Sequence, residues 1–199
     1  MKTAAYLFLA DGFEEIEAVA PADILKRSSK DVFLVSINST RQVRSAHGLV
    51  LTADWTWEEF VDGFAAAQSS VDKTALVFPG GLPGTDNLAA FLPLMDIAAA
   101  HLKAGGLVCA ICASPGRILP VLDARGTSVK GRRFTCYPGC EVAALGIGAE
   151  KVDASVVTDG NLITANGPGA ALDFGYAICA ALRGKEAAAV LKEAMMYKG

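Results

Sequence analysis

The chain has 199 residues and a net charge of −3, with 52% hydrophobic and 20% charged residues. This length supports one sizeable core, and the composition is that of a folded globular protein. The 18 Lys and Arg residues form no block, which argues against a nucleic-acid partner or a membrane surface bound by charge. No stretch approaches the ~20 apolar residues of a membrane span, and Asp11 ends the apolar run near the N-terminus. We therefore expect a single domain over residues 1–199 in the cytoplasm.

Short apolar runs alternate along the chain with longer helical patterns. Strands are predicted at Ala4–Ala10, Val32–Ile37, Ala75–Phe78, Leu107–Ile111 and Val156–Val157. Helices are predicted at Glu14–Lys26, Asn87–Lys103, Ser114–Leu122, Ala170–Leu182 and Lys185–Met196. Continuous apolar strands that alternate with helices are typical of an α/β fold, in which helices cover both faces of a mostly parallel sheet.

Two hairpins and one proline interrupt this pattern. His47-Gly48 and Asp159-Gly160 each separate two short strand-like runs, which are Gln42–Ala46 from Leu49–Ala53 and Ala154–Thr158 from Asn161–Ala165. Asp-Gly between such runs is a strong hairpin signal, and His-Gly is a weaker one. Pro21 lies inside the first helical pattern and predicts a kink or a break there.

Three turns should meet at the carboxyl edge of the sheet, where ligands bind in folds of this class. They follow the first, third and fourth of the main predicted strands, and they are Asp11–Glu17, Pro79–Gly84 and Cys112–Gly116. The third turn has the layout of a nucleophile elbow, because an apolar strand runs directly into Cys112 and then a helix. A thiol at a helix N-terminus should have a lowered pKa. The alternative, equally weighted from Cys112 alone, is a buried and inert cysteine.

Other chemistries fit the sequence less well. Cys109 and Cys112 have redox-motif or zinc-motif spacing, but Cys109 lies within a strand and should point away from Cys112. Cys136 and Cys140 make a poor second half of a zinc site, because no His is nearby. The chain has neither a dinucleotide fingerprint nor a Walker sequence. We therefore expect no metal and no cofactor.

Carboxyl and backbone groups could serve the thiol. Glu14, Glu15 and Glu17 suit the first turn of a helix, where the dipole stabilises them. Glu17 can instead turn inward beside the thiol, where it would have a raised pKa and could move protons. Gly80 and Gly81 would supply unobstructed N–H donors to an oxyanion, together with Ala113, although a simple tight turn is the alternative.

Four motifs resemble the ThiJ/PfpI family, within it the branch of the human Parkinson-disease protein deglycase. They run over essentially the whole chain and comprise Asp11–Val19, Phe78–Gly84, Ala110–Ala113 and Asn166–Glu186. The resemblance implies a flavodoxin-like three-layer sandwich and a homodimer. It also implies that Cys112 is a nucleophilic, readily oxidised cysteine, with Glu17 as its protonated partner. Gly81 and Ala113 would be the oxyanion donors. Gly80 and Tyr137 are further candidates for supporting roles.

The same resemblance implies a glutathione-independent glyoxalase or protein deglycase, acting on a small aldehyde or a glycated protein, with an oxidative-stress role. The alternative is a non-enzymatic redox sensor or chaperone that uses the same cysteine. Two departures from the family pattern matter. Ala113 stands where peptidase-like relatives carry His, which disfavours proteolysis, and Tyr137 stands where deglycase relatives commonly carry His. A phenol can donate a hydrogen bond but is a poor base near neutrality.

Overall fold

A seven-stranded sheet forms the centre of the molecule, seen in a computed structural model that describes residues 3–29, 31–66 and 70–198. Its strand order is β10-β11-β7-β6-β1-β2-β5. The strands are β1 (Ala4–Leu9), β2 (Val32–Ser36), β5 (Trp55–Thr56), β6 (Thr74–Phe78), β7 (Leu107–Ile111), β10 (Val156–Asp159) and β11 (Leu162–Ala165). All neighbours pair in parallel except β10 and β11. The expectation of a mostly parallel sheet is confirmed.

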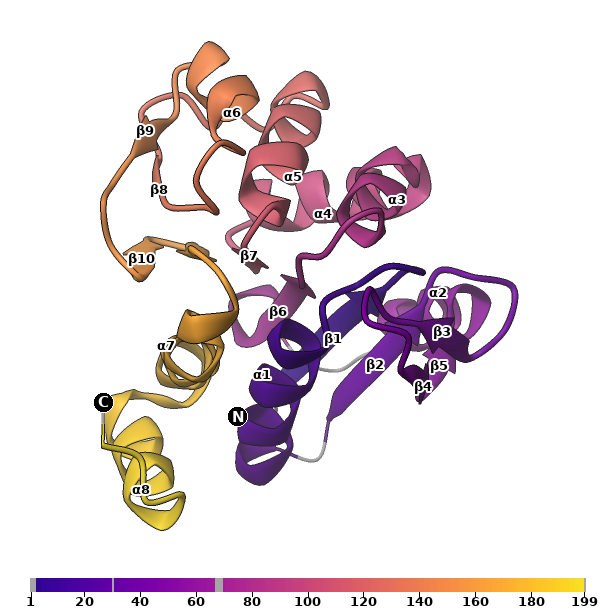
Figure 1. Cartoon of the computed structure of the whole chain (residues 1–199), viewed down its shortest axis with the longest axis vertical. Helices are drawn as coiled ribbons and strands as arrows, with labels where there is room; N and C mark the ends of the chain where they lie inside the picture. The colour runs from indigo at the N-terminus through magenta and orange to yellow at the C-terminus, as the bar shows by residue number, and fades with distance from the viewer. Residues whose placement is uncertain (1–2, 30, 67–69, 199) are drawn as a thin grey trace.

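Helices cover both faces of the sheet, as expected for a flavodoxin-like sandwich (Figure 1). Alternate residues of each buried strand face opposite layers, so that Tyr6 and Phe8 enter one core and Ala5 and Leu7 the other. The first layer contains α2 (Trp57–Ala66), α3 (Gly84–Ala90), α4 (Leu92–Lys103), α5 (Ser114–Ala124) and α6 (Val142–Gly146). The second contains α1 (Glu15–Ser28), α7 (Ala171–Arg183) and α8 (Lys185–Ala194).

Both expected hairpins are present. β3 (Gln42–Arg44) pairs antiparallel with β4 (Val50–Thr52), and β10 pairs antiparallel with β11. The remaining short elements are β8 (Arg133–Phe134), β9 (Glu150–Lys151) and the 3₁₀ turns η1 (Val71–Lys73) and η2 (Pro168–Ala170). The sequence pattern did not identify β5, β8, β9, α2 or α6.

Two helix predictions need correction. The expected helix Asn87–Lys103 is two helices, α3 and α4, which meet at Phe91 just before Pro93. A proline fits the first turn of a helix, where its missing N–H would have no acceptor within the helix, and the second helix begins there. No break occurs at Pro21, because α1 runs through it from Glu15 to Ser28. Among the described helices, none has the length and apolar character needed to cross a membrane.

Candidate functional site

Cys112 occupies the sharp turn between β7 and α5. Its φ of 64° lies in the left-handed region, which is uncommon for a residue other than glycine. Its N–H donates to the carbonyl of Ala165 at 2.9 Å, and its carbonyl accepts from the N–H of Tyr137 at 2.8 Å. Two neighbouring segments thus hold the strained backbone, as is common where a reactive side chain must be fixed in one direction.

Glu17 brings a buried carboxyl group to the same place from the first turn of α1. Its side chain is fully buried, and Oε2 accepts a hydrogen bond from the N–H of Gly80 at 2.8 Å. Oε1 is also buried and has no N–H or O–H donor within the described part of the chain. The helix turn is fixed by Glu14, whose carboxylate caps the N–H of Glu17 at 2.8 Å.

Gly80 separates the carboxyl group from the thiol and leaves room for both. A Cβ at this position would lie 2.4 Å from Glu17 Oε2, 2.6 Å from Cys112 Cβ and 3.1 Å from Cys112 Sγ. These separations are shorter than van der Waals contact, so a glycine is required here by space alone. The structure therefore brings Cys112, Glu17 and Gly80 together, as the sequence led us to expect.

The carboxyl and the thiol perturb each other's ionisation. Burial raises the pKa of Glu17 to about 7, and the charge of Glu14 adds to this. Burial also raises the pKa of Cys112 to about 12, helped by the charge of Glu17 and the hydrogen bond between the two side chains. The expectation that the helix N-terminus lowers this pKa is wrong in sign while Glu17 is ionised. Desolvation and the carboxylate outweigh the helix.

The N–H groups of Ala113 and Gly81 face the sulfur and lower the pKa of Cys112, against the larger opposing effects. Gly81 has a φ of 89°, and a Cβ there would lie 2.4 Å from the backbone nitrogen of Glu14. The turn that carries this donor thus packs directly on the start of α1. Gly81 and Ala113 thus lie where they can hydrogen-bond to negative charge on sulfur or on an atom bonded to it. The N–H of Gly80, also expected as an oxyanion donor, instead donates to Glu17 Oε2.

Tyr137 lies on the outer side of the site, in the loop after β8. Its side chain is 51% exposed, and its ring lies against Gly167, where an added Cβ would be 3.5 Å from Cδ2. The backbone of Tyr137 contacts Cys112 through the hydrogen bond given above. The structure therefore places this residue beside the site, with its phenol partly in solvent.

Two further residues, which the sequence pattern did not single out as site residues, hold the segments around the site together. Ser114 is fully buried, and its hydroxyl donates to the carbonyl of Pro79 at 2.6 Å, which ties α5 to the turn that carries Gly80. Glu15, which the sequence predicts to be a first-turn helix residue, has a carboxylate that accepts from Ser45 Oγ and from the N–H of His47. Both residues are polar and lie two positions from Cys112 and Glu17 in the sequence, which is the signal that could have identified them.

Within the described residues, one set of three side chains is arranged as metal ligands could be. Glu14, Glu15 and His47 have ligand atoms within 4.8 Å of one another. This set contains no cysteine, and Glu15 already pairs with His47 Nδ1 at 2.7 Å. The hydrogen bonds to Ser45 and His47 lower the pKa of Glu15 to about 2, although desolvation opposes them. These hydrogen bonds of Glu15 thus link α1 to the β3–β4 hairpin.

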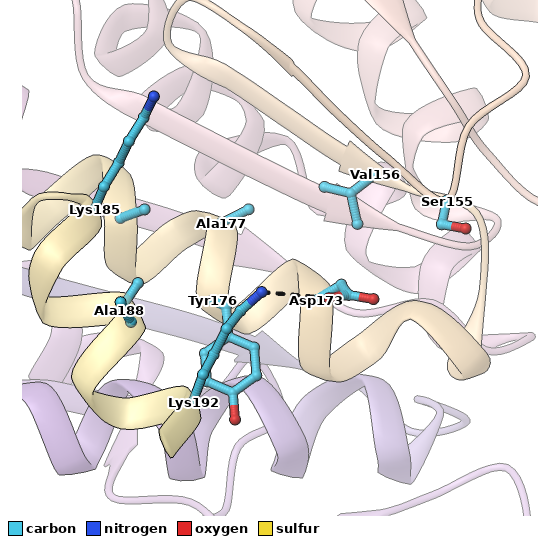
Figure 2. Close-up of a pocket in the computed structure, with 10 residues that line it drawn as sticks. Ser155, Val156, Asp173, Tyr176, Ala177, Lys185, Ala188 and Lys192 are labelled. Carbon is cyan, nitrogen blue, oxygen red and sulfur yellow. Dashed lines mark ion pairs between the residues drawn. The ribbon is translucent and has the colours of Figure 1, made fainter. Parts of the chain in front are cut away.

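A cavity of about 570 Å³ lies away from Cys112, between α7, α8 and β10 (Figure 2). Half of its ten lining residues are small and apolar, and Lys192 pairs with Asp173 at 4.0 Å. Lys192 also lies 5.1 Å from the ring centre of Tyr176, and Tyr197 donates to Asp173 at 2.7 Å. These polar groups satisfy one another, and none of the expected site residues lines this cavity.

Comparison with known proteins gives matches over nearly the whole chain. The model of the DJ-1/PfpI family matches residues 3–181. Protein dj-1beta of Drosophila melanogaster is 33% identical over 187 residues, which cover 94% of this chain and 92% of that protein. The glutathione-independent glyoxalase DJR-1.2 of Caenorhabditis elegans is 32% identical over 93% of this chain and 91% of its own. The crystal structure of Drosophila DJ-1beta superposes with a TM-score of 0.86 at 28% identity, covering 100% of both chains.

Proposed function

Because this chain belongs to the DJ-1/PfpI family, we propose that it is a glutathione-independent glyoxalase or protein deglycase that uses Cys112. One observation carries the proposal, which is the burial of a thiol and a carboxyl group on either side of Gly80. A relative named as a glutathione-independent glyoxalase supports the choice of reaction. The substrate is methylglyoxal or its adducts on protein.

The reaction begins when Cys112, as a thiolate, adds to the aldehyde carbon and forms a hemithioacetal. The Cys112 proton passes to Glu17, whose raised pKa makes it a suitable acceptor near neutrality. The N–H groups of Gly81 and Ala113 stabilise the oxyanion that forms on the former carbonyl oxygen. That oxygen then takes up the proton.

In the second stage, Glu17 moves a proton between the two adjacent carbons of the bound methylglyoxal. The carbon bonded to sulfur gives its C–H proton to Glu17, its hydroxyl proton passes to the neighbouring ketone oxygen, and this carbon becomes a thioester carbonyl. Glu17 returns its proton to the neighbouring carbon, which becomes an alcohol. Water then hydrolyses the thioester, which releases lactate and restores the Cys112 thiol. No external oxidant or reductant is required. Gly80 supports these steps by leaving the path between sulfur and carboxyl open, and Tyr137 can donate a hydrogen bond to substrate from the outer side.

The second candidate function is that of a redox sensor or chaperone. A half-buried thiol beside a carboxyl that can be protonated near neutrality supports it, because a neutral Glu17 could donate to a sulfinate formed on Cys112. All five cysteines are unpaired, which fits a reducing compartment such as the cytoplasm. The enzyme predicts aldehyde turnover, whereas a sensor predicts Cys112 oxidation without turnover.

A homodimer is also proposed, because one face of the molecule exposes large apolar side chains. Ile16 and Val19 on α1 are 54% and 44% exposed, and Leu49 and Val50 on the adjoining hairpin are 60% and 49% exposed. The hydrogen bonds of Glu15 with Ser45 and His47 join these two elements. Light scattering should therefore report twice the chain mass of 20.6 kDa, and Ile16→Glu should give the single-chain mass.

Consumption of methylglyoxal without glutathione tests the enzyme proposal. Cys112→Ser should abolish turnover, and Glu17→Gln should lower it by about 10²–10⁴, the usual effect of losing an acid–base group. Cys140→Ser is the matched control, because Cys140 is also partly buried but has no carboxyl partner in the described structure. Turnover that persists in Cys112→Ser would reject the mechanism. Absence of turnover in the unaltered protein, with selective oxidation of Cys112 by peroxide, would favour the sensor.

A further inference from the structure

A polar cavity of about 510 Å³ lies at the end of the sheet opposite Cys112. It is lined by Thr3, Lys73, Leu182, Arg183, Gly184 and Ala187. Thr3 immediately precedes β1 and Lys73 immediately precedes β6, so both mark the amino edge of the parallel sheet. Figure 1 shows α8 at the lower end of the molecule and α5 and α6 at the upper end. This cavity is therefore separate from the thiol site.

Thr3 contributes an unsatisfied buried hydroxyl to the cavity wall. The residue is 4% exposed, and Oγ1 has no hydrogen-bond partner in the part of the chain that the structure describes. Buried polar atoms are nearly always paired, and leaving one unpaired costs about 1–3 kcal/mol. A ligand oxygen that enters the cavity would be a suitable partner.

The N-terminus of α8 opens into the same cavity. Its N-cap residue is Gly184, which has no side chain to accept a hydrogen bond from the first turn. The first backbone bond of the helix is from the N–H of Ala188 to the carbonyl of Gly184. The N–H groups of Lys185, Glu186 and Ala187 therefore have no acceptor within the helix. Such uncapped N–H groups, together with the helix dipole, bind anions.

Two cations, Lys73 and Arg183, line the cavity. Neither Lys73 nor Arg183 forms an ion pair with any described residue. A second cavity of about 500 Å³ shares Thr3 and Arg183 and adds Lys26 and Arg27, which pair with Asp54 and Asp23. Asp31 is the acidic residue that lines this second cavity. The two adjoining cavities thus carry a positive balance in a chain whose net charge is negative.

We propose that this cavity is a binding site for a phosphate group, with Arg183, Lys73, Thr3 and the first turn of α8 as its donors. The donors differ in direction and number, and a phosphate offers several strong acceptor oxygens to match them. A guanidinium can bind two of these oxygens, while an ammonium group acts as a point charge. The Thr3 hydroxyl and the α8 N–H groups can take the others. The ligand is inorganic phosphate or the phosphate group of a small metabolite.

Titration of the ¹⁵N-labelled full chain with inorganic phosphate tests the site. At constant ionic strength, the amide signals of Lys185, Glu186 and Ala187 should shift with a saturable dependence on phosphate. Glycerol phosphate and glycerol form the second and third arms. Tighter binding of glycerol phosphate than of phosphate identifies a phosphomonoester as the ligand, whereas equal binding identifies the free anion. Glycerol should give no shift.

Charge-neutralising variants decide whether binding is local. Arg183→Gln and Lys73→Gln should each weaken binding by about tenfold, as expected for the loss of a charged hydrogen bond. Lys130→Gln, near β8 at the other end of the molecule, makes the same change of net charge and should bind normally. Thr3→Val keeps the side-chain shape and should also weaken binding. The proposal is overturned if phosphate produces no saturable shift, or if Lys130→Gln weakens binding as much as Arg183→Gln.

Discussion

Replacing Glu17 by Gln should remove a pH dependence from the Cys112 thiol. With Glu17 present, the pair loses its first proton at about pH 7 and its second at about pH 12. Between these values one proton is shared by the carboxyl and the sulfur, because two negative charges cannot be held so close together in a buried site. Some of the singly protonated pairs carry that proton on Glu17, and these have a reactive thiolate.

The magnitude follows from the first of the two pKa values. The share of singly protonated pairs rises about tenfold between pH 6 and pH 8 when the pKa is about 7. The reactive fraction of these pairs does not change with pH, so the rate of thiol modification should also rise about tenfold. It should then remain level towards the second pKa. An isolated cysteine with an ordinary pKa near 9.0 would instead keep rising through this range.

The rate of Cys112 modification by iodoacetamide, followed by peptide mass spectrometry from pH 5 to pH 10, measures this profile. In Glu17→Gln the inflection near pH 7 should disappear. Loss of the carboxylate charge should also lower the pKa of Cys112, because that charge and its hydrogen bond are two of the causes that raise it. The thiol should then titrate alone, with its backbone donors still in place.

Glu14→Gln provides the matched control, because it neutralises a neighbouring carboxyl group and leaves the pair intact. The charge of Glu14 raises the pKa of Glu17, so removal of that charge should move the inflection in the modification rate to lower pH without abolishing it. An inflection near pH 7 that survives in Glu17→Gln would show that another group controls the thiol. A profile of the unaltered protein with one inflection above pH 8 would equally refute the coupled pair.

Three further changes test how the site and the fold are held. Gly80→Ala should displace the thiol or the carboxyl and lower methylglyoxal turnover at least about tenfold, whereas Gly146→Ala, with nothing within 4 Å of the added carbon, should not. Ser114→Ala should lower the free energy of unfolding in urea by about 1–3 kcal/mol, because it leaves the carbonyl of Pro79 unsatisfied. Burial lowers the pKa of His101, so the unfolded chain takes up its proton first and stability should fall as pH drops below about 6.5. His101→Gln should remove that part of the loss in denaturation measured against pH.

The sheet and the site turns were predictable because their signals are local. An apolar run such as Leu107–Ile111 predicts a buried strand, and the parallel arrangement places the carboxyl ends of such strands at the same edge of the sheet. The β3–β4 hairpin was likewise identified from His47-Gly48. By contrast, α2 was missed although Trp57, Phe60 and Phe64 have helical spacing, because their packing onto the sheet is a tertiary feature.

The electrostatics of the site could not be predicted from the same signals. A cysteine at a helix N-terminus suggests a lowered pKa, and that rule considers only the dipole and the N–H groups. The structure adds two effects of longer range, which are the burial of Cys112 and the charge of Glu17, 95 positions earlier in the chain. Both depend on how α1 packs against the turn at Gly80. Local sequence therefore located the thiol but gave the wrong sign for its pKa.

Burial of Glu17 gives the site its chemical character, and the surrounding backbone makes that burial tolerable. An ionised carboxyl in this position is costly, which is why its pKa rises to about 7. The N–H of Gly80 offsets part of the cost. In the resting site the proton stays on Cys112, whose pKa of about 12 lies above that of Glu17, and the N–H groups of Gly81 and Ala113 lower the pKa of the thiol only in part. Transfer of the proton from sulfur to the carboxyl group neutralises Glu17 and leaves a negative charge on the sulfur of Cys112, to which these N–H groups can donate. Addition to an aldehyde requires this transfer.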